Sequence, residues 1–282
     1  MKNQFNALSI GLGMLAFVVS PAMGGTIFQT GSSGSTYTDT LGDGQGSANL
    51  LRDIASATIS NDANNLYISL DINPAGNIAT GGAFNYIFGF TTGSPTAGGD
   101  TSANATTHGN AYGRAISFDS SFGGMTDFIG IFGAGGSGSV ASPYTSYGFN
   151  DYVFGTPTSS SAPGVWTKIN TVLSGQPISM GPGSTTNNAI TITVPLSDFS
   201  DNISLTPGTT IDFDIDSTGT SGNQTAYDSL AFQGPIQGTF NSTAQYNATV
   251  LDSYTITAVP EPSTLALAGL SGLSVLLFRR RK

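Results

Sequence analysis

The segment Ile211-Asp212-Phe213-Asp214-Ile215-Asp216 alternates strictly between apolar and acidic residues. Successive side chains of a β-strand point to opposite faces of the sheet, so this pattern predicts a strand with one apolar and one acidic face. We expect the three apolar side chains to pack inward and the three aspartates to face solvent. The segment therefore indicates a half-buried strand.

The same period of two recurs along the chain, most clearly over residues 65–72 and 189–194. Turns rich in Gly and Asn separate the apolar runs, and no segment between the two ends of the chain shows a sustained helical period. This pattern predicts an all-β fold, an antiparallel β-sandwich of the jelly-roll or immunoglobulin-like type, in one domain over residues 25–258. Further strands are expected at residues 55–60, 84–91, 114–118, 128–132, 147–154, 165–172, 229–232 and 249–257.

The composition excludes several classes of site. The chain has 282 residues, 38 of them Gly, with no Cys and one His. The lack of Cys excludes disulfides, zinc–thiolate sites, iron–sulfur clusters and thiol nucleophiles. A single histidine, His108, excludes any site that needs two imidazoles.

The charges are distributed unevenly. Four of the eight basic residues form the final run of residues 279–282, and the formal net charge is −9. Glu261 is the one glutamate among the 17 acidic residues, so the predicted domain owes its acidity to aspartate. Nucleic-acid binding requires clustered Lys and Arg, and this distribution excludes it.

Residues 1–24 have the three-part organisation of a secretory signal peptide. Lys2 gives a basic start, an apolar run covers residues 7–19, and the small residues Ala22 and Gly24 follow. We predict a signal helix, export, and cleavage by signal peptidase after Gly24 or Ala22. The apolar run is short for a membrane anchor, which is the alternative interpretation.

Residues 259–282 form a second targeting segment. A proline-flanked motif, an apolar stretch over residues 265–278 and a basic end follow one another, and the marked positions are Val259, Pro260, Glu261, Pro262, Arg279, Arg280 and Arg281. The prolines hold the chain extended, and the positive-inside rule places the basic end in the cytoplasm. The apolar stretch predicts a hydrophobic, marginally membrane-spanning helix.

This order of features resembles the PEP-CTERM sorting signal of Gram-negative bacteria. The resemblance covers the last two dozen residues and implies recognition by an exosortase, transient residence in the inner membrane, and cleavage near the motif. It further implies a final location at the cell surface or outside the cell, in association with exopolysaccharide, biofilm or floc. An ordinary single-span tail anchor is the alternative.

A second resemblance concerns the predicted domain. Residues 39–44 form a Gly-Asp turn, and residues 59–68 contain an Asn-Asp-Ala turn followed by Leu-Tyr. This order is similar to the start of bacterial carbohydrate-binding or DOMON-like sandwiches. The resemblance covers about a third of the domain and depends on common turn chemistry.

Two sets of aspartates are candidate ligands for Ca²⁺, which prefers several oxygen ligands. The first set lies on one face of a predicted strand and comprises Asp212, Asp214 and Asp216. The second surrounds a glycine-containing turn and comprises Asp39, Asp43 and Asp53. One strand cannot surround an ion by itself, so a solvated strand face is the alternative for the first set. No cofactor is expected to be required.

Aromatic residues gather between residues 144 and 166. Sugar-binding modules stack exposed aromatic rings on the apolar faces of sugars, and the candidate platform is Tyr144, Tyr147, Tyr152 and Trp166. Alternate positions also fit a strand that contributes to the core, which is the competing interpretation.

The residues disfavour an enzyme. The chain has no Gly-x-Ser-x-Gly elbow, and the domain without its tail has no glutamate for a glycosidase pair. We expect a non-enzymatic surface or extracellular-matrix protein. A carbohydrate-binding module is the first alternative, and an Asp-dependent hydrolase is the second.

Overall fold

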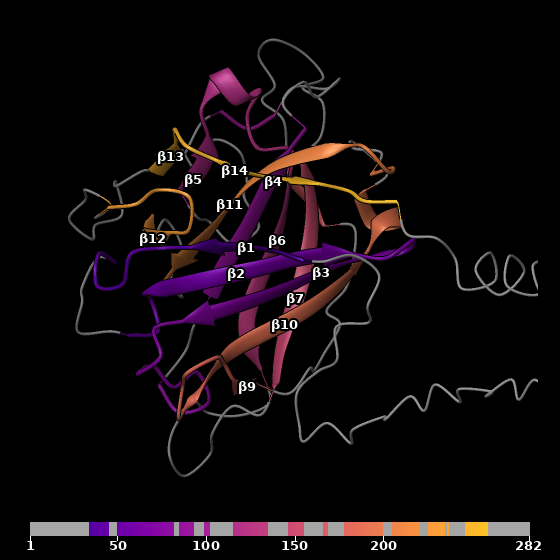
Figure 1. Cartoon of the computed structure of the whole chain (residues 1–282). Helices are drawn as coiled ribbons and strands as arrows, with labels where there is room; N and C mark the ends of the chain where they lie inside the picture. Colours follow the sequence, from indigo (N-terminus) through magenta and orange to yellow (C-terminus); the bar gives the residue numbers. More distant parts are fainter. Residues whose placement is uncertain are drawn as a thin grey trace, which may run out of the picture.

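The computed structural model describes residues 34–44, 50–81, 85–92, 99–101, 115–134, 146–154, 166–168, 178–199, 205–219, 225–234, 236 and 246–258. Within these residues the chain is mostly β-strand, with two 3-10 turns, η1 (Ser120–Phe122) and η2 (Leu196–Phe199). The predicted all-β sandwich is confirmed, since antiparallel sheets pack on each other (Figure 1).

The first sheet has five strands in the order β1-β2-β3-β10-β9. They are β1 (Ser35–Thr38), β2 (Ile54–Asn61), β3 (Asn65–Ile72), β10 (Asn187–Pro195) and β9 (Ser179–Met180). Asp62 closes the turn between β2 and β3, because its Oδ1 accepts the backbone N–H groups of Asn64 and Asn65, both at 2.7 Å. Such an Asx turn explains why two strands of period two are joined directly here.

The second sheet has seven strands in the order β12-β11-β4-β6-β7-β8, with β14 also paired to β11. They are β4 (Asn85–Thr91), β6 (Asp127–Ala134), β7 (Ser146–Phe154), β8 (Trp166–Lys168), β11 (Thr210–Thr218), β12 (Ala226–Ser229) and β14 (Asp252–Thr255). Two short strands, β5 (Ile116–Phe118) and β13 (Tyr246–Ala248), form a separate parallel pair.

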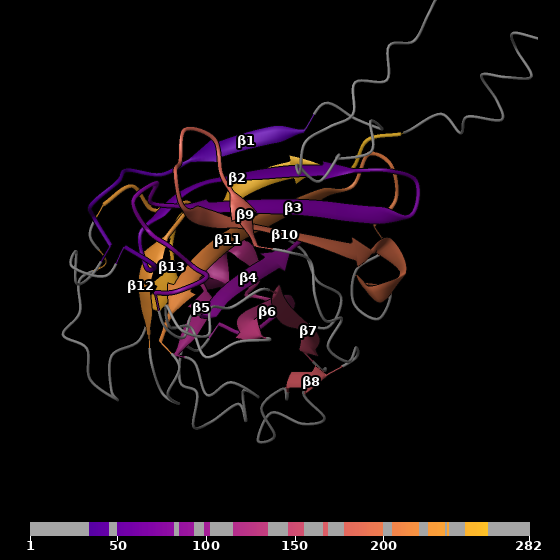
Figure 2. The ribbon, with the colours of Figure 1, turned by 90° about the horizontal axis from the view of Figure 1, so that it is seen from below.

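The main core lies between the two sheets. Viewed from below, β1, β2, β3 and β10 form one layer and β4, β6 and β7 the other (Figure 2). Figure 1 shows that the strands of the two layers cross at a steep angle, as in sandwiches with orthogonal packing. Alternate residues of β2, β3, β10 and β11 supply much of this core, among them Ile59, Ile68, Ile192 and Phe213.

Strand β11 confirms one half of its sequence prediction and contradicts the other. Ile211, Phe213 and Ile215 are buried in the main core as expected. Asp214 and Asp216 are fully buried rather than solvated, each with 0% of its surface exposed. A second apolar cluster, which includes residues from β5 and β13, covers the opposite face of the sheet. The expectation of an acidic face in water is therefore wrong for these two residues.

Other sequence expectations are met unevenly. The prediction of a strand at residues 229–232 is wrong, because β12 ends at Ser229 and the chain then turns. The strand expected at residues 249–257 is shorter in the structure, where it forms β14. The sequence did not predict β1, β9 or β13. The choice between a jelly-roll and an immunoglobulin-like topology stays a prediction.

The predicted helical segments, residues 1–24 and 259–282, lie outside the described residues. Among the residues that the structure does describe, no helix has the length and apolar character needed to cross a membrane.

Candidate functional site

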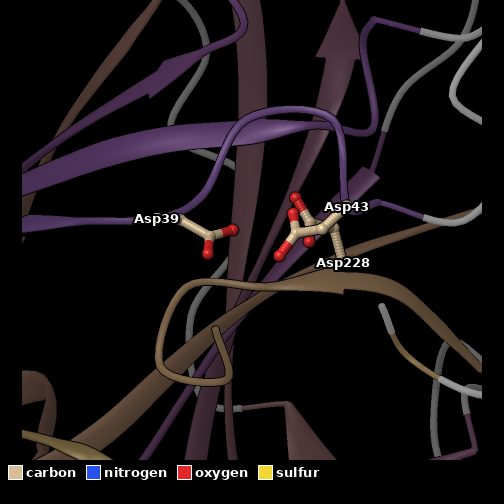
Figure 3. Close-up of side chains that lie close together, drawn as sticks. All are labelled: Asp39, Asp43 and Asp228. Atoms are coloured by element: carbon tan, nitrogen blue, oxygen red, sulfur yellow. The ribbon is translucent and has the colours of Figure 1, made fainter. Parts of the chain in front are cut away.

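Three aspartate side chains from two distant parts of the sequence meet at one end of the sandwich. Asp39 directly follows β1, Asp43 lies in the next turn, and Asp228 belongs to β12. One carboxylate oxygen of each lies within 4.8 Å of the corresponding oxygens of the other two. Figure 3 shows that the three carboxylates point toward one another. We call Asp39, Asp43 and Asp228 the carboxylate cluster.

Asp53 fixes the turn that carries Asp43 through hydrogen bonds. Both carboxylate oxygens of Asp53 accept the backbone N–H of Gly42, at 2.9 and 3.1 Å, and Oδ2 also accepts Nδ2–H of Asn73 at 2.6 Å. Gly42 has a φ of 89°, in the left-handed region that favours glycine. The sequence Leu41-Gly42-Asp43 therefore bends sharply enough to bring Asp43 back toward Asp39.

Gly44 lets the turn approach β12 closely. A Cβ at this position would lie 3.4 Å from both Cβ and Cγ of Asp228, and 3.3 Å from the carbonyl oxygen of Arg52. These distances are at or just inside ordinary van der Waals contact, so a larger side chain would press on Asp228. Glycine at 44 thus fits the close packing of the turn against the cluster.

One oxygen of Asp228 is hydrogen-bonded to the first sheet, and the other is buried without a partner. Its Oδ2 accepts the backbone N–H of Ile54 at 2.6 Å, while Oδ1 has no hydrogen-bond partner. Oδ2 of Asp39 and both oxygens of Asp43 are also buried without a partner. Buried polar atoms in proteins are nearly always hydrogen-bonded, so four such oxygens in one place are unusual.

Ionising all three carboxyl groups of the cluster is electrostatically costly. Burial raises the pKa of Asp39, Asp43 and Asp228, and nearby carboxylates raise each pKa further. Asp53 contributes to this repulsion in all three cases. Burial and like charges both disfavour the ionised form of a carboxyl group. A positive charge bound among these oxygens would offset both the cost of burial and the repulsion between the carboxylates.

The sequence grouped Asp39 and Asp43 with Asp53, and the structure brings the first two together with Asp228 instead. Asp53 is 4% exposed and its oxygens are engaged by Gly42 and Asn73, so it positions the turn. Sequence reasoning missed Asp228. The one available signal was an acidic residue inside the otherwise uncharged segment of residues 225–232.

The second predicted set, Asp212, Asp214 and Asp216, does not gather around one point. Asp212 accepts the Ser253 hydroxyl at 2.6 Å on the outer part of the sheet. Asp214 is saturated by protein donors, with Ser229 Oγ at 2.6 Å, Ile215 N at 2.8 Å and Ala231 N at 3.1 Å. Asp216 is buried with neither oxygen hydrogen-bonded.

The candidate glycan platform falls largely outside the described side chains. Tyr144 lies outside the described residues. Tyr147 and Tyr152 lie in β7, where their backbones pair with Gly133 and Phe128, and Trp166 pairs with Phe154 at the start of β8. The side chains of these three residues are outside the described part, so the platform stays a prediction.

Comparison with known proteins identifies the C-terminal segment. Residues 258–282 match the PEP-CTERM protein-sorting motif. The match contains all the positions that the sequence marked, from Val259 and the Pro260-Glu261-Pro262 triplet to the terminal arginines. No curated protein and no solved structure matches the chain. The resemblance of the domain to DOMON-like sandwiches has no support from these comparisons.

The molecule thus combines an all-β sandwich with a sorting segment. The chain carries a PEP-CTERM motif, which indicates an extracellular protein sorted by an exosortase. Such sorting implies export across the inner membrane to the cell surface, with exosortase as the processing partner.

Proposed function

We propose that this chain is a non-enzymatic surface or matrix protein of a Gram-negative bacterium, associated with exopolysaccharide or biofilm. The observation that carries the proposal is the sorting motif at residues 258–282, directly attached to a β-sandwich domain. Signal peptidase removes residues 1–24, exosortase processes the tail, and the sandwich is the part that remains outside the cell.

The junction between domain and tail supports this division of roles. Asn61 at the end of β2 holds Thr257 through three hydrogen bonds: its Oδ1 accepts Thr257 N–H and Thr257 Oγ1–H at 2.9 and 3.0 Å, and its Nδ2 donates to Thr257 O at 3.0 Å. The motif begins at the next residue. The folded domain therefore reaches the processing segment without an intervening linker.

The charge of the chain fits a hydrated extracellular layer. The formal net charge is −9, and only 9% of residues are charged. A net charge far from zero favours solubility, and because it is negative here it repels anionic surfaces. In this proposal the acidic domain is a hydrated component of the extracellular polymer layer and does not depend on opposite charge to remain there.

Sorting is tested by following full-length protein in the producing bacterium. The triple variant Pro260→Ala, Glu261→Ala, Pro262→Ala should stay in the inner-membrane fraction, while wild type appears outside the cell. The variant Ser263→Ala, Thr264→Ala, which changes the two residues directly after the Pro260-Glu261-Pro262 triplet, is the matched control and should sort normally. Normal surface display of the triple variant would contradict exosortase sorting through these residues.

The matrix role is tested separately with a deletion strain. Loss of the gene should reduce the amount or cohesion of the extracellular polymer layer, and wild type but not the triple variant should restore it. An unchanged polymer layer would overturn the matrix role. Saturable binding of the protein to a defined glycan would assign it to the carbohydrate-binding class instead, and depolymerisation of the polysaccharide would refute the non-enzymatic assignment.

A further inference from the structure

We propose that the carboxylate cluster binds a divalent cation, and that Ca²⁺ is the ion it fits. The bound ion would join the turn at residues 39–44 to β12, across the two sheets. This inference goes beyond the proposed matrix function, and sorting through the tail does not depend on it.

The cluster alone would not justify the proposal, since acidic groups often lie together on protein surfaces. The independent observation is Asp228, which has 0% of its surface exposed, carries an unpartnered Oδ1, and points its carboxylate into the cluster (Figure 3). This side chain cannot be interpreted as part of a solvated acidic face. A buried carboxylate oxygen without a hydrogen-bond donor requires another electropositive partner, and an ion supplies one.

The donor set is that of a hard cation. All three candidate ligands are carboxylates, and four of their oxygens, Oδ2 of Asp39, both oxygens of Asp43 and Oδ1 of Asp228, accept no hydrogen bond. Ca²⁺ takes about six to eight oxygen ligands and accepts carboxylates in either one- or two-oxygen geometry. Backbone carbonyls and water would complete its coordination. The lack of nitrogen and sulfur donors in the cluster disfavours zinc and copper.

The choice between Ca²⁺ and Mg²⁺ rests on their coordination chemistry. The cluster oxygens lie within 4.8 Å of one another, close enough to share one cation. Ca²⁺ accepts carboxylates in flexible geometry at about 2.3–2.6 Å. Mg²⁺ requires near-octahedral geometry and usually keeps several waters instead of being held by protein carboxylates alone.

The position of the site predicts what the ion does. β1 is an edge strand with largely exposed residues, and its end is held to the segment after β12 by Gln233, whose Nε2 donates to Thr38 O at 3.0 Å. Thr40 Oγ1 adds a bond to Gln233 Oε1 at 3.1 Å. An ion shared by Asp39, Asp43 and Asp228 would strengthen this junction and fix the N-terminal edge of the domain.

The test uses the full-length chain in mild detergent, first stripped of metal with EDTA. Calorimetric titration with CaCl₂ should give one site with a Kd of about 10⁻⁴–10⁻³ M, as in extracellular Ca²⁺ modules. At tenfold Kd, Ca²⁺ should raise Tm by about 3–6 °C, and Mg²⁺ at the same concentration should raise it less. No binding up to about 10 mM Ca²⁺ would overturn the proposal, and equal shifts with Mg²⁺ would overturn the choice of ion.

Asp43→Asn is the sharpest variant, because the Asp43 carboxylate makes no hydrogen bond that the substitution could break. In EDTA its Tm should equal or exceed that of wild type, since one like charge is gone. With Ca²⁺ it should lose at least tenfold in affinity. Asp212→Asn, on β11 away from the cluster, is the matched control and should bind as wild type. Unchanged Ca²⁺ affinity in Asp43→Asn would show that the ion binds elsewhere and overturn the site.

Discussion

Asp228 accepts a hydrogen bond from the backbone N–H of Ile54 at 2.6 Å, although the two residues are 174 positions apart in the sequence. The bond joins β12 of the second sheet to β2 of the first. The same carboxylate lies close to those of Asp39 and Asp43, and its other oxygen has no hydrogen-bond partner. A single buried side chain therefore fixes the relative position of the sheets and completes the carboxylate cluster.

Two substitutions of Asp228 should separate its hydrogen bond to Ile54 from its charge in the carboxylate cluster. Asp228→Ala leaves the buried Ile54 N–H without an acceptor and should cost about 1–3 kcal/mol of unfolding free energy. Asp228→Asn keeps an acceptor oxygen and removes a charge, so in EDTA its Tm should lie well above that of Asp228→Ala. Thermal unfolding in EDTA provides the measurement. Equal losses in both variants would show that the bond to Ile54 contributes little.

Asp214 and Asp216 are both fully buried on β11 but should respond differently to the change to asparagine. Asp214 accepts bonds from Ile215, Ser229 and Ala231, so Asp214→Asn places an amide among donors and should cost about 1–3 kcal/mol. Asp216 has no hydrogen-bond partner, and burial together with Asp214 and Asp228 raises its pKa well above the ordinary value. Asp216→Asn removes a carboxyl group whose ionised form is disfavoured by burial and by like charges, so it should leave Tm unchanged or higher at pH 7.5.

Chemical denaturation of the two variants, side by side, checks this contrast. A large loss of stability in Asp216→Asn would mean that the ionised Asp216 carboxylate stabilises the folded state.

Asp214 should also give the protein a recognisable pH dependence. Burial raises the pKa of its carboxyl group to about 6, against hydrogen bonds that lower it. In the unfolded chain the pKa is about 3.9, so the folded state holds the proton more tightly. The resulting stabilisation is complete below about pH 4 and is lost as pH rises through about 6, to a total of about 3 kcal/mol.

The corresponding measurement is the difference in unfolding free energy between wild type and Asp214→Asn from pH 4 to 7.5. This difference should shrink as the pH rises through the window. A difference that grows with pH would show that folding favours the ionised form of Asp214.

Substitution of Asn61, at the boundary between domain and tail, should destabilise the folded domain. Its side chain is 2% exposed, and its Oδ1 accepts the Tyr254 hydroxyl at 2.8 Å in addition to its bonds with Thr257. Asn61→Ala removes these bonds together and should lower the unfolding free energy by about 2–4 kcal/mol. Hydrogen exchange should show faster exchange at Thr257, whose N–H donates to Asn61. Unchanged protection there would contradict the role of Asn61 at the junction.

The sequence was sufficient to predict the sandwich because strand alternation is a local property. Ile211, Phe213 and Ile215 are buried as their period of two requires. The same alternation could not reveal that the other face of β11 is covered, since this depends on β5 and β13, short strands from distant parts of the chain. For that reason the alternation wrongly predicts that Asp214 and Asp216 face solvent.

The candidate site was predictable only in its local part. Asp39 and Asp43 are four residues apart around Gly42, and a turn with a positive φ explains their approach. Asp228 joins them only because the two sheets pack with β12 next to the β1 end of the first sheet. No periodicity or spacing in the sequence carries that information. Asp53 was grouped with the ligands for its proximity in sequence, whereas its hydrogen bonds to Gly42 and Asn73 hold the turn in place.

The most direct test of the cation site is a crystal structure of the protein grown with Ca²⁺, with the ion located by its anomalous scattering. The account predicts one peak bonded to oxygens of Asp39, Asp43 and Asp228 at about 2.3–2.6 Å. A map with no peak among these three carboxylates, from crystals in which the cluster is ordered and Ca²⁺ is at least about 10 mM, would contradict it.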